Sequence, residues 1–143
     1  MVHALSEARR LLAPAGTLID LRPLSLDVPL EIVSPQGSQS AGLVDLSPDI
    51  GDDIAADNTF QAAVASGTLQ QVKLETFDFA YYWDTVGALK ADFEEKWKGE
   101  AILRAEVLRQ ARRLFKATRP HSRLRLGIRM QLAAYRQPKS LSA

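Results

Sequence analysis

Residues 3–22, with the sequence HALSEARRLLAPAGTLIDLR, decide the fold that we expect for this chain. The first part places apolar side chains at helical spacing, namely Leu5, Ala8, Leu11 and Leu12. Pro14 cannot continue that helix, and Gly16 can adopt the backbone of a sharp turn. The next residues form a short apolar run, Leu18, Ile19 and Leu21, which is typical of a strand covered on both faces. The stretch therefore predicts a helix that turns directly into a buried strand.

The turn between these two elements resembles part of a known family. Residues 11–19, LLAPAGTLI, are similar to the turn that leads into the fifth strand of class I S-adenosylmethionine-dependent methyltransferases. Ala15 stands where that family has the first glycine of a Pro-Gly-Gly turn. The resemblance implies the C-terminal half of a methyltransferase-like, Rossmann-like sheet. In that layout the last strand of the chain would lie between residues 17–21 and residues 68–83.

The half of that family that binds the cofactor has no counterpart in the sequence. The family holds S-adenosylmethionine on a glycine-rich turn and an acidic residue, and none of the eight glycines here has G-x-G-x-x-G or G-x-G-x-G spacing. The resemblance therefore implies that the chain binds no cofactor and is not a methyltransferase on its own. The resemblance therefore also allows for a partner protein that supplies the missing half. We identify no catalytic residue, because the sequence contains no nucleophile elbow, phosphate loop or histidine-centred triad.

The composition is that of an ordinary globular protein. The chain has 143 residues, and we expect one domain over residues 1–136 with a polar tail at 137–143. It has no cysteine and only two histidines, so we expect no metal site. No apolar run approaches the length of about 20 residues that a membrane helix needs. A cytoplasmic location without membrane attachment is the corresponding expectation.

Further elements follow from the apolar pattern along the chain. We expect a hairpin of two strands at 28–33 and 42–46, placed beside the strand at 17–21. Three helices are expected at about 49–66, 85–98 and 101–118, with a long strand at 68–84 between the first two. Alternation of apolar and polar residues from Leu124 to Leu132 predicts a last strand with one buried face. Together these elements predict an α/β fold with about four helices and about five mixed strands.

One candidate pocket combines an acid with aromatic residues. Asp20 lies between two apolar neighbours in the first strand, which is an unusual setting for a carboxylate. Tyr81, Tyr82 and Trp83 end the aromatic run of the long strand, where they could line an apolar pocket. The alternative is structural: Asp20 hydrogen-bonds a neighbour, and the aromatic side chains fill the core. We favour the structural interpretation for both groups.

The charges are distributed unevenly along the chain. Residues 45–100 carry twelve acidic residues and four lysines, whereas residues 101–143 carry eleven basic residues and one glutamate. Three arginines share one face of the last strand and form a candidate anion-binding site, namely Arg123, Arg125 and Arg129. The alternative is that the acidic and basic halves neutralise each other, and we favour it because the net charge is only +1.

Two functions remain from these observations. The first is a non-catalytic module for binding or dimerisation, most simply a homodimer, because a core-type strand has lost a neighbour. We expect the hairpin to fill that gap and its outer surface to meet a second copy. The second is a nucleic-acid- or anion-binding protein that uses the basic C-terminal segment. An enzyme of another kind is the least favoured class.

Overall fold

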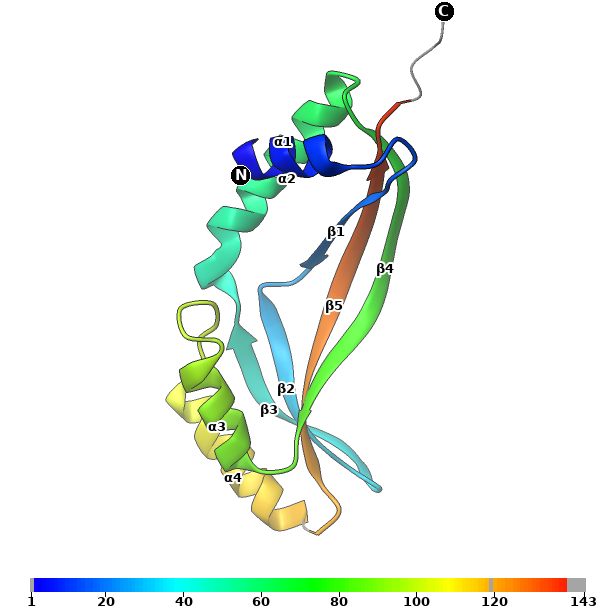
Figure 1. Ribbon diagram of the computed structural model, residues 1–143. Helices are drawn as coiled ribbons and strands as arrows, with labels where there is room; N and C mark the ends of the chain where they lie inside the picture. The colour runs from blue at the N-terminus through cyan, green and yellow to red at the C-terminus, as the bar shows by residue number, and fades with distance from the viewer. Residues whose placement is uncertain (1, 119, 139–143) are drawn as a thin grey trace, which may run out of the picture. The chain divides into compact units, whose positions relative to one another are not determined.

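The computed structural model describes residues 2–118 and 120–138, and it confirms the α/β class (Figure 1). Residues 139–143 of the expected tail lie outside the described part of the chain. The helices are α1 (Val2–Leu11), α2 (Ile50–Ala65), α3 (Val86–Glu95) and α4 (Ala105–Thr118), with a short 3-10 helix at Ser47–Asp49. The strands are β1 (Leu18–Pro23), β2 (Asp27–Ser34), β3 (Gly37–Asp45), β4 (Gln70–Trp83) and β5 (Arg123–Arg136).

The strands form an open antiparallel sheet with β5 at its centre. The order is β1-β5-β2-β3, and β4 also pairs with β5. The predicted position of the last strand between the first strand and the long strand is therefore confirmed. The expected mixed, Rossmann-like arrangement is not confirmed, because the sheet is antiparallel.

The chain packs as two compact units. Among the described residues, the first contains 2–22, 51–77 and 130–138, and the second contains 23–50, 78–118 and 120–129. Both β4 and β5 are fourteen residues long and contribute to each unit. The single domain expected over residues 1–136 stays a prediction.

The core of the first unit lies between α1, α2 and the sheet. Its buried members are Ala63, Leu69, Ala133 and Tyr135, with Leu5, Leu18 and Phe60 packed against them. The Phe60 and Tyr135 rings stack with their centroids 4.6 Å apart. Aromatic stacking of this kind adds to the burial of apolar area, so the pair anchors α2 on β5.

The prediction that the first strand is covered on both faces is wrong. Ile19 and Leu21 are 58% and 50% exposed, whereas Leu18 packs in the core of the first unit. Successive side chains of a strand point to opposite faces, so Asp20 and Arg22 share the face of Leu18. An apolar run of three residues could not reveal this, because the two polar residues on the inner face, Asp20 and Arg22, bind each other and Arg22 also binds Asp57 of α2.

The second unit is built on the hairpin of β2 and β3, which the sequence predicted. The expected placement of this hairpin beside the first strand is wrong, because β2 pairs with β5 in the register Leu30–Leu126. Four of the side chains at this junction are almost completely buried, namely Leu30, Ile32, Leu124 and Leu126. The predicted alternation along the last strand is thereby confirmed for its first half.

Helix α4 approaches the hairpin closely at Gly42. This glycine has a φ of 132°, and a Cβ atom added to it would lie 2.8 Å from Cγ2 of Val107. Val107 is buried on the same helix as Ala111 and Phe115. Glycine is therefore required at residue 42 both for its backbone conformation and for the packing of α4.

Candidate functional site

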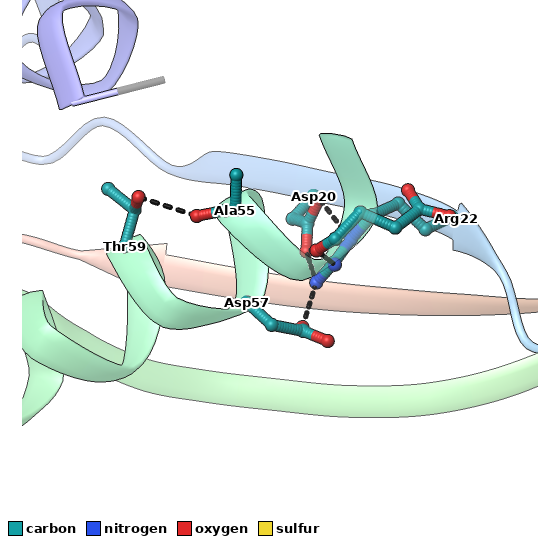
Figure 2. Close-up of polar contacts among 6 residues, drawn as sticks. Asp20, Arg22, Ala55, Asp57 and Thr59 are labelled. Atoms are coloured by element: carbon teal, nitrogen blue, oxygen red, sulfur yellow. Dashed lines mark hydrogen bonds and ion pairs between the residues drawn. The ribbon is translucent and has the colours of Figure 1, made fainter. Parts of the chain in front are cut away.

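Asp20, the acid singled out by the sequence, binds the guanidinium group of Arg22 (Figure 2). Arg22 Nε donates to both carboxylate oxygens of Asp20 at 3.0 and 3.1 Å, and Nη2 donates to Oδ2 at 2.7 Å. The same guanidinium donates to the side chain of Asp57 and to the backbone oxygen of Asp53, both on α2. Asp20 and Arg22 therefore tie β1 to α2.

This cluster is shielded from solvent. The Arg22 and Asp20 side chains are 13% and 11% exposed. Burial lowers the pKa of Arg22, but the hydrogen bonds to Asp20 and Asp57 outweigh it and hold that pKa above its ordinary value. Burial, followed by the charge of Asp20, raises the pKa of Tyr135 above its ordinary value. A carboxylate committed to a cation in this way stabilises the fold and is poorly placed to accept a proton from a substrate.

Of the three aromatic candidates, Trp83 is a core residue of the second unit. Its side chain is buried, and Nε1 donates to Asp92 Oδ2 at 2.7 Å. The hydrogen bond that Lys96 donates, followed by that from Trp83, lowers the pKa of Asp92 below its ordinary value. Trp83 therefore links the end of β4 to α3.

The two tyrosines have exposed positions with aromatic or cationic neighbours. The ring of Tyr81 meets Trp97 edge-on with centroids 4.9 Å apart. Tyr82 lies beneath the guanidinium of Arg123, with its Cζ 5.0 Å from the ring centroid. Asp20 belongs to the first unit, whereas Tyr81, Tyr82 and Trp83 belong to the second.

The three arginines proposed for anion binding each pair with an acid in the second unit. Arg123 Nε lies 2.7 Å from Asp84 Oδ1, and Arg129 Nη1 lies 2.9 Å from Asp78 Oδ1. Arg125 Nη1 donates to Glu31 Oε2 at 2.9 Å, directly across the β2–β5 ladder. These contacts agree with the interpretation in which the acidic and basic parts of the chain neutralise each other.

A hollow of about 340 Å³ lies beside two of these arginines. Its charged lining consists of Asp27, Glu31, Asp78, Arg125 and Arg129. Three carboxylates therefore stand against two guanidinium groups. This lining gives an anion no net attraction, so the geometry does not favour the predicted use of Arg125 and Arg129.

Four cations of α4 have no ion pair among the described residues. They share one exposed stripe at helical spacing, namely Arg109, Arg112, Arg113 and Lys116. Arg112 and Lys116 also line a hollow of about 350 Å³ next to Thr85, at the start of α3. Helical spacing was the available signal for this stripe.

Sequence reasoning missed the exposure of β4 in the first unit. Residues 70–76, which we call the β4 edge segment, are exposed on both faces. Val72 and Leu74 within it are 44% and 55% exposed. Among the described residues, β4 pairs with β5 and with no other strand, so one edge of this segment is open.

The described residues offer no metal site, and comparisons with known proteins find no match for the chain. The described residues contain no group of three or more His, Cys, Asp or Glu side chains placed to hold a metal ion. No helix among them is long and apolar enough to cross a membrane. Comparison of the chain with protein-family models, curated proteins and solved structures finds no match.

Proposed function

We propose that this protein is a non-catalytic assembly module that acts in the cytoplasm as a homodimer. The observation that carries the proposal is the open β4 edge segment in the first unit, which exposes Val72 and Leu74. An exposed strand edge presents unpaired backbone N–H and C=O groups, and apolar side chains on it favour the addition of another strand. Association covers both the backbone groups and the apolar area.

The candidate residues from the sequence support a structural rather than a catalytic role. Asp20 is held by Arg22, Trp83 is held by Asp92, and the three arginines of β5 are held by acids. The side chains that would have to act on a substrate are thus engaged in stabilising the two units. Surface association is the function that leaves these contacts intact.

The hairpin, which we expected to meet the second copy, is the weaker candidate. Its open strand β3 begins with exposed polar residues, Ser38, Gln39 and Ser40, and contains Gly37 and Gly42 at positive φ. Its other end is covered by the bridge between Asp45 and Ile102. Glycine weakens a strand edge as a template for pairing, so β4 is the better surface.

Lysine on the β4 edge segment tests the proposed function. Lysine is a residue that natural edge strands use against association, so Val72→Lys with Leu74→Lys should abolish the dimer. Ile54→Lys is the matched control, because Ile54 is also an exposed apolar residue of the first unit but lies on α2. Sedimentation velocity should show a monomer for the first variant and a dimer for the control. Equal behaviour of the two variants would reject the role of β4.

A second candidate function is the binding of nucleic acid or another polyanion by α4. The observation in its favour is the exposed stripe of four cations without ion pairs among the described residues. Changing Arg109, Arg112, Arg113 and Lys116 to glutamine should then reduce binding of a labelled oligonucleotide, with a strong salt dependence for the native chain. Changing Arg123, Arg125 and Arg129 to glutamine is the comparison, and it should have the smaller effect.

The resemblance of residues 11–19 to class I methyltransferases rests on the sequence and remains part of the proposal. It predicts that calorimetric titration with S-adenosylmethionine gives no binding, because the chain lacks the glycine turn and ribose-binding acid of that family. It also allows a protein partner to supply the missing half. Binding at micromolar cofactor would show that this half is not needed.

A further inference from the structure

Leu74 of the β4 edge segment lies between two residues of opposite charge. Lys73 and Glu75 flank Leu74, and the Lys73 ammonium lies 3.0 Å from the Glu75 carboxylate, so both side chains leave the same face of the strand. Leu74 and Val72 point to the opposite face. The sequence around Leu74 is therefore charged on one face and apolar on the other.

We propose that two copies pair antiparallel along this segment, with a two-fold axis at Leu74. In that register each residue lies opposite the one equally far from Leu74 in the second copy. Lys73 then faces Glu75 of the second copy, and Glu75 faces Lys73 of the second copy. The two leucines face each other across the axis. This proposal rests on the proposed homodimer and specifies its interface.

Neighbouring registers are less favourable. Moving the axis to Lys73 sets the two lysines opposite each other, and moving it to Glu75 sets the two glutamates opposite each other. Like charges placed directly across a strand pair are destabilising, whereas opposite charges are stabilising. An axis between two of these three residues places Leu74 opposite a charged side chain. Of these registers, only the one with its axis at Leu74 places unlike charges opposite each other and the two leucines opposite each other.

A second copy fits this edge better than a strand of unrelated sequence. The pattern is its own complement, and a two-fold contact uses the same segment on both copies, so it closes at two subunits. The area of the exposed side chains alone is small, but pairing also satisfies the open backbone groups along the segment. The result is a continuous sheet across the dimer axis.

Disulfide formation tests the geometry, because the chain has no cysteine of its own. Directly opposed residues in an antiparallel pair have Cα atoms about 4.5–5.5 Å apart, within the range of a disulfide. Leu74→Cys should therefore form a covalent dimer under mild oxidation at micromolar concentration. Leu43→Cys is the matched control, since Leu43 is 53% exposed on the other open strand, β3. It should stay monomeric on a denaturing gel.

Charge reversal gives an independent measurement. Lys73→Glu and Glu75→Lys should each raise the dimer dissociation constant about tenfold, because each replaces two attractive pairs by two repulsive ones. The double variant K73E/E75K should restore the native value. If the native chain is a dimer but Leu74→Cys forms no cross-link and the charge variants dissociate like the native chain, the register proposed for β4 is wrong. The proposed homodimer would still hold in that case. A chain that stays monomeric at every concentration would overturn both.

Discussion

The carboxylate of Asp20 and the guanidinium of Arg22 lie two residues apart on β1 and form three hydrogen bonds of 2.7–3.1 Å. Both side chains point toward α2, which adds the Asp57 carboxylate and the Asp53 carbonyl to the same guanidinium. An acid in an apolar strand is thus explained by a buried ion pair. The pair fixes the face that β1 turns toward α2.

Removing the cation alone should be costly. Arg22→Met leaves the Asp20 charge buried without its partner, and we expect it to lower the free energy of unfolding by about 3 kcal/mol. The double variant Asp20→Val with Arg22→Met should recover most of that loss. Asp57→Asn is the control and should cost less than 1 kcal/mol. Urea unfolding measures all three, and a double variant no more stable than Arg22→Met would contradict this account.

Tyr135 should titrate late. Its burial, with the nearby charge of Asp20, raises its pKa above the ordinary value of about 10. Because folding raises this pKa, the stabilisation is fully present below pH 10 and is lost as the pH rises through the folded value. Absorbance at 295 nm should show one of the three tyrosines ionising last, and Tyr135→Phe should remove that component. Loss of a different component would show that the late phenol is not Tyr135.

Asp92 should make stability fall in acid. The hydrogen bonds donated by Lys96 and Trp83 lower its pKa, so its contribution to stability is present above the unfolded value of about 3.9 and is lost as the pH falls through the folded value. Asp92→Asn should flatten the dependence of unfolding free energy on pH below 4. The change is followed by tryptophan fluorescence in urea. Parallel curves for the native chain and the variant would exclude this contribution.

Alanine substitutions at Gly42 and Gly37 should distinguish the stability cost of backbone strain from the cost of a packing clash. Both have positive φ, but an added Cβ meets Val107 at residue 42 and nothing within 4 Å at residue 37. Gly37→Ala should cost about 1 kcal/mol of stability, and Gly42→Ala about 3 kcal/mol. Val107→Ala in the Gly42→Ala background should recover part of the difference. Equal losses for the two glycine variants, measured by thermal unfolding, would show that α4 does not constrain residue 42.

Local pattern was enough to predict the elements, since each depends on neighbours in the chain. The alternation from Leu124 to Ile128 identified the central strand and its buried face, and the hairpin was expected at 28–33 and 42–46, although β3 begins at Gly37. The last strand was also correctly placed beside the first. These features depend on spacing and on turn residues, which the sequence displays directly.

Partners far apart in the chain were not predictable. Arg125 pairs with Glu31 across 94 residues, and that contact follows from the β2–β5 register rather than from any motif. The three arginines predicted to bind an anion therefore form ion pairs with acidic residues instead. The exposure of Ile19 and Val72 was also missed, because an apolar residue in a strand does not indicate which face or edge of the sheet is exposed to solvent.

The most direct test of the account is the mass of the native chain in solution. Light scattering coupled to size exclusion should be run over a range of micromolar concentrations, beside the variant with Val72→Lys and Leu74→Lys. We expect the native chain to give twice the chain mass of 15.8 kDa and the variant to give the mass of one chain. A native mass of 15.8 kDa throughout that range would contradict self-association as its function.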